Sequence, residues 1–180
     1  MVEVAPRKDV PVRWRAYSLA FKNADGDVPE PYRTHAATSH QALRVIEAVW
    51  ADHGDEPIGR LYTEIGTRFH TQDLKSLDAV AAALEATGLD AAYLDSADDE
   101  RWDTEIRGSM DEAIERVGTD VGVPILVFRD GDAEAAIFGP VVSPAPTGDE
   151  ASALWDGVMT MAWSPSFFEL KRTRTGPPIL

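Results

Sequence analysis

The sequence contains no cysteine among its 180 residues. A chain without cysteine forms no disulfide, gives no thiolate to a metal and carries no thiol chemistry of its own. It also lacks an excess of basic residues, with 17 Lys and Arg against 31 Asp and Glu and a formal net charge of −14. Nucleic acids and anionic membranes attract basic surfaces, so this balance argues against both as partners.

Long apolar runs are absent as well. The alanine-rich stretch from Ala79 to Leu84 is far too short to cross a bilayer, and the first residues mix charge with proline and show no signal-peptide core. We therefore expect a cytoplasmic protein that does not bind membranes. Its 44% hydrophobic and 27% charged residues are typical of a globular protein that buries a core, either one domain or one domain with an insertion.

The usual sequence signatures of metal, hydrolytic and phosphate sites are missing. The four histidines show no H-x-x-x-H spacing, and neither a G-x-S-x-G elbow nor a Ser-His-Asp order is present. The residues from Gly118 to Gly122 do not form a phosphate loop, and the acidic cluster from Asp95 to Glu100 is typical of a helix N-terminus. The sequence therefore predicts no metal site and no catalytic residue in this chain.

Hydropathy patterns predict a strand, then a block of helices. Alternation over Val10–Leu19 indicates the strand, and a proline- and glycine-marked loop follows from Asn23 to Tyr32. Apolar stripes predict helices that begin at Ser39, at Pro57, at Ser76 and near Asp98.

The last third of the chain has a different pattern. Strands are predicted over Pro124–Phe128 and Ala135–Phe138, joined by a turn at Asp130–Asp132. Thr147 and Glu150 have the spacing of a capping box, and they open a helix that is expected to bury Leu154, Trp155, Val158 and Met161. Three short strands are few for five helices, which suggests that a strand is missing.

Several segments of the chain together resemble one known family. In chain order they are Ser18-Leu19 with Asn23, Pro29-Glu30-Pro31-Tyr32-Arg33, Leu61-Tyr62 with Gly66-Thr67-Arg68-Phe69-His70, Asp120-Val121-Gly122-Val123-Pro124, Phe138-Gly139-Pro140-Val141-Val142-Ser143, and Phe167-Phe168-Glu169-Leu170-Lys171-Arg172-Thr173-Arg174-Thr175. The combination resembles the DsbA-like mycothiol-dependent reductases, also called mycothiol-dependent nitroreductases, along the whole chain.

The resemblance implies an α/β, thioredoxin-like (DsbA-like) fold with a helical insertion domain. The thioredoxin-like domain would comprise residues 1–32 and 118–180, and the inserted helices residues 33–117. Family members open with a strand and a C-P-x-C helix, which have no counterpart here, so the first βα unit is expected to be missing. In the family that strand lies between the strands corresponding to Val10–Leu19 and Pro124–Phe128, and the peptide bond before Pro124 would be cis.

The resemblance also assigns a groove for substrate or thiol. Val123 and Pro124 would present backbone groups to it, and Asn23, Tyr32 and His70 would line it. Each residue also has a structural explanation: Val123-Pro124 can simply start a strand, Asn23 is a common turn former, Tyr32 can anchor a loop, and His70 can cap a helix. The basic run at the tail, Lys171, Arg172 and Arg174, is expected to pack on an acidic surface.

The leading interpretation is a truncated thiol-disulfide oxidoreductase of the mycothiol-dependent type, inactive as given because the C-P-x-C pair is absent. The resemblance implies mycothiol as co-substrate, and a small thiol, an electrophile or a protein disulfide as partner. Two alternatives stay open. The chain could be a cysteine-free module that binds a thiol or peptide, or it could be an assembly subunit, such as a homodimer, that pairs through an exposed strand edge.

Overall fold

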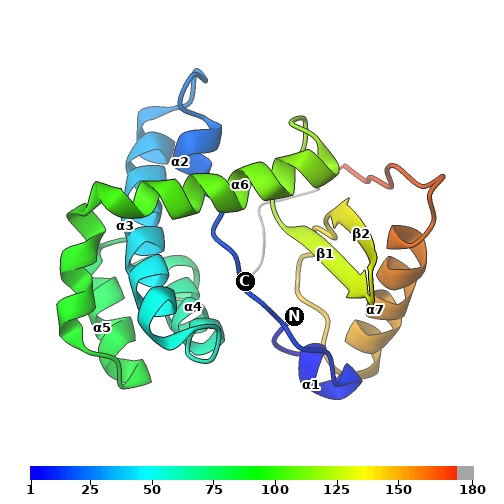
Figure 1. Cartoon of the computed structure of the whole chain (residues 1–180), viewed down its shortest axis with the longest axis horizontal. Helices are drawn as coiled ribbons and strands as arrows, with labels where there is room; N and C mark the ends of the chain where they lie inside the picture. Colours follow the sequence, from blue (N-terminus) through cyan, green and yellow to red (C-terminus); the bar gives the residue numbers. More distant parts are fainter. Residues whose placement is uncertain (174–180) are drawn as a thin grey trace. The chain divides into compact units, whose positions relative to one another are not determined.

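The computed structural model describes residues 1–173, and the chain divides into two compact units. Unit 1 joins Met1–Val12 to the chain from Ala113 onward, and unit 2 is Arg13–Glu112. The structure is helix-rich and α/β, and its described residues form one sheet of two strands (Figure 1). The domain boundaries expected from the resemblance, after residues 32 and 117, stay a prediction.

Unit 2 is built from helices of several types. They are α2 (Leu19–Lys22), α3 (Glu30–His53), α4 (Ile58–Gly66), the π-helical η1 (Thr67–Thr71), α5 (Leu77–Thr87), the 3₁₀ helices η2 (Ala91–Asp98) and η3 (Glu100–Trp102), and most of α6 (Asp103–Val117). The predicted long helix near Asp98 therefore begins at Asp103, after two 3₁₀ segments.

The core of unit 2 forms where α3, α4 and α5 pack together. The largest fully buried side chains of this core are Leu61 of α4, Val45 and Val49 of α3, and Val80 and Leu84 of α5. The predicted start of α5 is confirmed, since the Ser76 hydroxyl accepts a hydrogen bond from the Ala79 N–H at 3.4 Å. Gly88 then ends the helix with φ of 73°, a left-handed conformation that glycine adopts without strain.

Helix α3 begins nine residues before its predicted start at Ser39. Pro29 is its N-cap, and Pro31 occupies the first turn, where a missing N–H leaves no hydrogen bond unmade. Most side chains from Glu30 to Ser39 are exposed, so this part of the helix has no apolar stripe to reveal it. As a result, Tyr32 lies on a helix and not on the predicted loop.

The strand predicted over Val10–Leu19 is wrong. Residues 10–18 have no regular secondary structure, and Leu19 already belongs to α2. Within unit 2, side chains satisfy the polar backbone of this segment: the Ser109 hydroxyl donates to the Ala16 carbonyl at 2.7 Å. The alternation of apolar residues instead reflects the inward packing of Trp14 and Ala16. The Trp14 ring stacks on Tyr62, with 4.8 Å between ring centroids, and Ala16 is buried.

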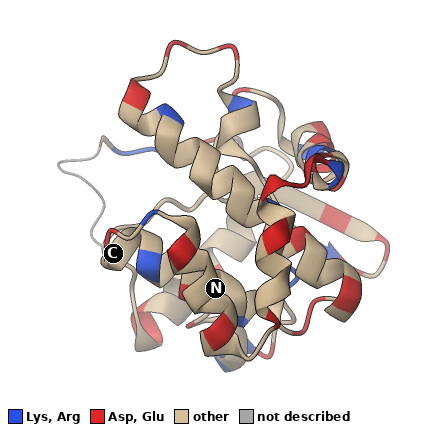
Figure 2. Cartoon of the chain, turned by 90° about the vertical axis from the view of Figure 1, so that its left-hand side faces the viewer, with Lys and Arg blue, Asp and Glu red and all other residues tan. Residues whose placement is uncertain are grey.

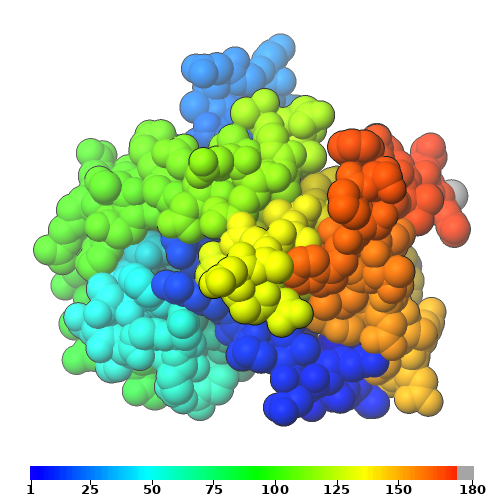
Figure 3. Space-filling model, turned by 45° about the vertical axis from the view of Figure 1, so that its right-hand side comes forward, coloured from blue at the N-terminus to red at the C-terminus, as the bar shows by residue number. Residues whose placement is uncertain are grey.

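Unit 1 contains α1 (Ala5–Lys8), β1 (Ile125–Asp130), β2 (Ala133–Phe138) and α7 (Gly148–Ala162). The predicted hairpin is confirmed: β1 and β2 pair antiparallel around a two-residue turn in which Gly131 has φ of 59°. Phe128 packs its ring against Trp155 of α7 at 5.5 Å, which places one sheet face in the core. Val127 and Phe138 stay about 40% exposed, and the hairpin, in yellow, is visible at the surface in Figure 3.

Helix α7 begins where predicted but is capped differently. Thr147 occupies the N-cap position without a side-chain hydrogen bond, so the predicted capping box is wrong. The Glu3 carboxylate caps the helix instead, because it accepts a hydrogen bond from the Gly148 N–H at 2.9 Å. This hydrogen bond, together with Arg7, holds the pKa of Glu3 below its usual value. Leu154 was expected inside but is 36% exposed, whereas its neighbour Trp155 is buried.

The tail motif extends past the described part of the chain. Its last two residues, Arg174 and Thr175, lie outside the described residues, as does one member of the predicted basic run. Within the described portion, Phe168 and Leu170 are strongly exposed.

Candidate functional site

The segment that leads into β1 offers unused backbone groups. The peptide bond between Val123 and Pro124 is cis, and both residues are exposed. The Pro124 carbonyl accepts from the Gly139 N–H at 2.8 Å, but the N–H and C=O of Val123 have no hydrogen-bond partner among residues 1–173. Val123 can therefore offer one donor and one acceptor to an extended ligand.

The other three predicted groove residues lie in unit 2, on separate elements. Asn23 ends α2, and its Nδ2 donates to the Leu19 carbonyl at 2.8 Å, which is the structural role that the sequence left open. Tyr32 is exposed on the first turn of α3, and His70 is exposed in η1. Although the residue is exposed, partial desolvation of its ring and the nearby Lys75 lower the pKa of His70. In the described chain no hydrogen bond or ring contact joins these three residues.

A chain of buried polar side chains crosses unit 2. Ser18 Oγ lies 3.0 Å from His40 Nδ1, and His40 Nε2 lies 3.0 Å from Asp103 Oδ1. Arg44 holds the same carboxylate with two hydrogen bonds of 2.7 and 2.9 Å and donates a third to the Ala97 carbonyl. This polar chain links the start of α2 to α3 and to the start of α6.

Hydrogen-bond accounting assigns the tautomer of His40. Ser18 Oγ accepts from the Phe21 N–H at 3.2 Å, so the hydroxyl proton is free to donate to His40 Nδ1. His40 Nε2 then carries the ring proton and donates it to the Asp103 carboxylate. Burial lowers the pKa of His40, more strongly than the nearby Asp103 raises it, so the ring is neutral near pH 7.

This arrangement is structural and not a hydrolytic triad. Ser18 is fully buried, and its oxygen caps α2, so no substrate reaches it. The sequence analysis missed the arrangement, because its members are separated by 22 and 63 residues. The only local signal was Ser18 itself, a good N-cap residue directly before a short helix.

The neutral state of His40 predicts a pH-dependent stability. Its pKa in the folded chain lies below the unfolded value of about 6.5, so the unfolded chain binds a proton first as the pH falls. The contribution of His40 is complete above pH ~6.5 and is lost as the pH falls below that value, by at most about 1.4 kcal/mol per pH unit. Urea unfolding at pH 7.5 and 5.5 should show a larger decrease for the wild type than for His40→Gln. Equal decreases would contradict the assignment.

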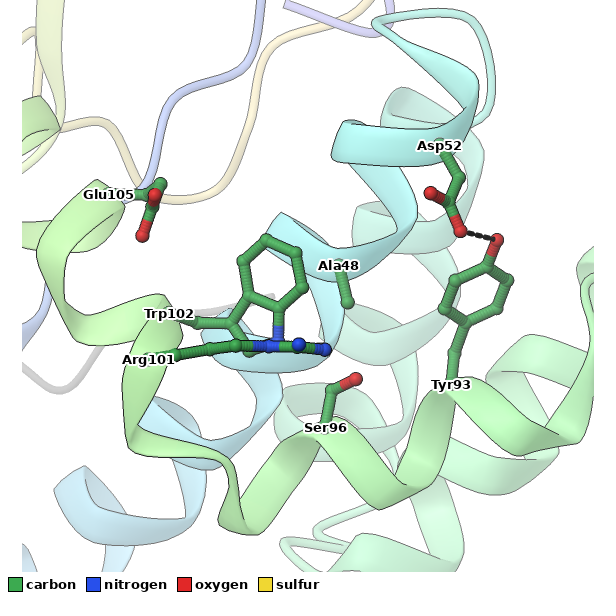
Figure 4. Close-up of a pocket in the computed structure, with 7 residues that line it drawn as sticks. All are labelled: Ala48, Asp52, Tyr93, Ser96, Arg101, Trp102 and Glu105. Carbon is green, nitrogen blue, oxygen red and sulfur yellow. Dashed lines mark hydrogen bonds between the residues drawn. The ribbon is translucent and has the colours of Figure 1, made fainter.

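Unit 2 also contains a cavity of about 490 Å³ between α3 and the segment from η2 to α6 (Figure 4). Its lining mixes aromatic, acidic and basic side chains: Ala48, Asp52, Tyr93, Ser96, Arg101, Trp102 and Glu105. The Tyr93 hydroxyl donates to Asp52 Oδ2 at 2.8 Å and also lies 2.9 Å from His53 Nε2. The sequence analysis did not single out this cavity, because its members come from four separate elements.

The comparisons with known proteins identify the family. The model of one protein family, described as Rv2466c-like, mycothiol-dependent nitroreductase Rv2466c, matches residues 1–172. The chain belongs to this family. A curated relative, the "Uncharacterized protein Rv2286c" of Mycobacterium tuberculosis (strain ATCC 25618 / H37Rv), is 31% identical over 176 residues, which cover 96% of this chain and 74% of the relative. The resemblance seen in the sequence is thus confirmed at the level of the family.

The 180 residues contain no thiol. Over residues 1–173, no group of three or more His, Asp or Glu side chains could hold a metal ion. In the same range, no helix is both long and apolar enough to span a membrane.

Proposed function

We propose that this chain carries the thiol- and substrate-binding surfaces of a thioredoxin-like, DsbA-type mycothiol-dependent reductase, and that by itself it has no redox turnover. Membership of the family over residues 1–172 supports the first part. The absence of any cysteine supports the second part and carries the proposal. The strand and C-P-x-C helix that open family members are not among these 180 residues.

The chemistry of thiol exchange explains why turnover needs a cysteine. A thiolate attacks a disulfide sulfur, a mixed disulfide forms, and a second thiolate resolves it. A serine hydroxyl cannot take this role without a strong base, and Ser18, the serine beside His40, is fully buried. Any mycothiol that this chain binds is therefore not captured covalently.

The candidate binding groups are the five positions named from the sequence, two in unit 1 and three in unit 2. The unpaired N–H and C=O of Val123, next to Pro124, suit the amide of an extended thiol or of a peptide disulfide. Tyr32 and His70 are exposed and available for polar contacts, whereas the Asn23 amide nitrogen is already bonded. The partner class is a small thiol, an electrophile or a protein disulfide.

The absence of turnover is tested with the chain as it stands. With mycothiol and a disulfide or nitro substrate, we expect the rate to equal the background without protein. Intact mass after incubation with mycothiol disulfide should stay unchanged, because no sulfur is available for a mixed disulfide. A rate above background that survives treatment with iodoacetamide would contradict the proposal.

Binding is tested separately by titration calorimetry with mycothiol. Saturable binding is expected, and His70→Ala should weaken it about fivefold, the usual effect of losing one hydrogen bond. Tyr32→Phe should act in the same direction, and His53→Ala, which removes an exposed histidine from the last turn of α3, is the matched control. Absence of binding, or an equal effect of His53→Ala, would overturn the binding assignment even if turnover is absent.

A further inference from the structure

The cavity in unit 2 has the size of a small-molecule site. Its volume of about 490 Å³ lies within the usual range for such sites, roughly 300–1,000 Å³. Ala48 and Asp52 line it from α3, whereas Ser96, Trp102 and Glu105 come from η2, η3 and α6. Because all of the lining residues belong to unit 2, the cavity is complete within one compact unit.

The charge around the cavity favours a cation. Two carboxylates, Asp52 and Glu105, line it, and the single lining cation, Arg101, is already paired with Asp99 at 2.8 Å. The pKa of Tyr93 is raised first by its hydrogen bond to Asp52, then by burial, and then by the negative charges of Asp52 and Asp90. Figure 2 shows that the Asp and Glu positions, in red, are spread over many helices and loops, in keeping with the net charge of −14.

Trp102 supplies an aromatic surface that already holds a cation. The Arg101 guanidinium lies over its ring, 5.0 Å from the centroid, and Figure 4 shows the two side chains together between Glu105 and the Asp52–Tyr93 pair. The Arg101 side chain is 71% exposed, so it is weakly held and readily displaced. A ligand ammonium can take its place over the indole.

Trp102 also has an unused donor. Its Nε1 atom is buried and has no hydrogen-bond partner among the described residues. An unpaired buried N–H is unfavourable, and an acceptor oxygen on a ligand would satisfy it. The Ser96 hydroxyl lines the same cavity and adds a second polar contact.

We infer that this cavity binds a small organic cation, a primary amine carried on a ring or short chain that also bears an oxygen. The ammonium replaces the Arg101 guanidinium over Trp102, with Asp52 and Glu105 as counter-charges. The ligand oxygen accepts from Trp102 Nε1. This binding needs no thiol and is independent of the function proposed above.

The test follows the indole N–H resonances by NMR while tyramine is added to the full chain. The chain has five tryptophans, and Trp102→Phe identifies the resonance of Trp102 by its loss. We expect a saturable shift of that resonance with tyramine and none with tyrosol, its neutral alcohol analogue. Glu105→Gln and Asp52→Asn, both at exposed positions, should each raise Kd about fivefold.

Two further variants make the test specific. Arg101→Gln should lower Kd about threefold, because it removes the competing cation. Asp111→Asn, which removes an exposed carboxylate from α6 outside the cavity, should leave Kd unchanged. The inference is overturned if the shift does not saturate, if tyrosol acts as tyramine does, if Arg101→Gln weakens binding, or if Asp111→Asn weakens it as much as Glu105→Gln.

Discussion

Replacing Asp103 with alanine is expected to lower the free energy of unfolding by roughly 2–4 kcal/mol. The substitution removes the acceptor for two side chains at once, His40 and Arg44. These side chains are 9% and 11% exposed, so neither regains full hydration. The loss falls short of that of a deeply buried ion pair, because Asp103 itself is 21% exposed. Urea unfolding at pH 7.5 measures the effect.

Matched variants separate the buried polar chain from general charge effects. Asp111→Ala removes an exposed carboxylate from the same helix and should change the free energy of unfolding by less than about 0.5 kcal/mol. Asp103→Asn keeps an oxygen for His40 but loses the charge opposite Arg44, so its effect should lie between the two. An effect of Asp103→Ala no larger than that of Asp111→Ala would contradict the structural role of this polar chain.

Local sequence signals were sufficient to predict the elements whose ends are determined by residues at those ends. Ser76 and Gly88 enclose α5 because a hydroxyl cap and a left-handed glycine each act within one helical turn. The turn of the β1–β2 hairpin was predicted for the same reason, from Gly131. Such signals require no knowledge of distant parts of the chain.

The predicted strand over Val10–Leu19 failed because a strand depends on a neighbour. Alternation of apolar residues describes which side chains point inward, and it did so correctly for Trp14 and Ala16. It does not show that another strand is available to pair with the backbone. In the described chain, side chains form hydrogen bonds with this backbone instead of a second strand. The Ser109 hydroxyl donates to the Ala16 carbonyl, and Ser18 caps α2.

The candidate sites were the least predictable part. His40 was one of four histidines without metal spacing, and nothing local connects it to Asp103 or Arg44. The cavity around Trp102 likewise forms only when α3 packs against residues 91–105. The family, in contrast, was evident from the order of short motifs, and the match over residues 1–172 confirmed it.

Replacing Trp155 with alanine should unfold unit 1 selectively. Its core is small: Trp155 packs against Phe128 and lies with Val4 and Val158 in one buried cluster. A two-stranded hairpin is only marginally stable unless a helix packs on it. Truncation of a buried tryptophan to alanine lowers the free energy of unfolding by roughly 3–5 kcal/mol. Unit 2 has a separate core on α3, α4 and α5, which this substitution leaves intact.

Hydrogen exchange measured by mass spectrometry distinguishes the two units in this variant. Amides of β1, β2 and α7 should lose their protection, whereas those of α3 and α5 should keep it, because their core contains none of the affected side chains. Leu154→Ala is the matched control, since the neighbouring side chain on α7 is 36% exposed and its truncation should cost less than about 1 kcal/mol. Equal loss of protection in α5, or equal effects of the two variants, would contradict this role of Trp155. Only a buried residue in the core of unit 1 can unfold that unit and leave unit 2 folded.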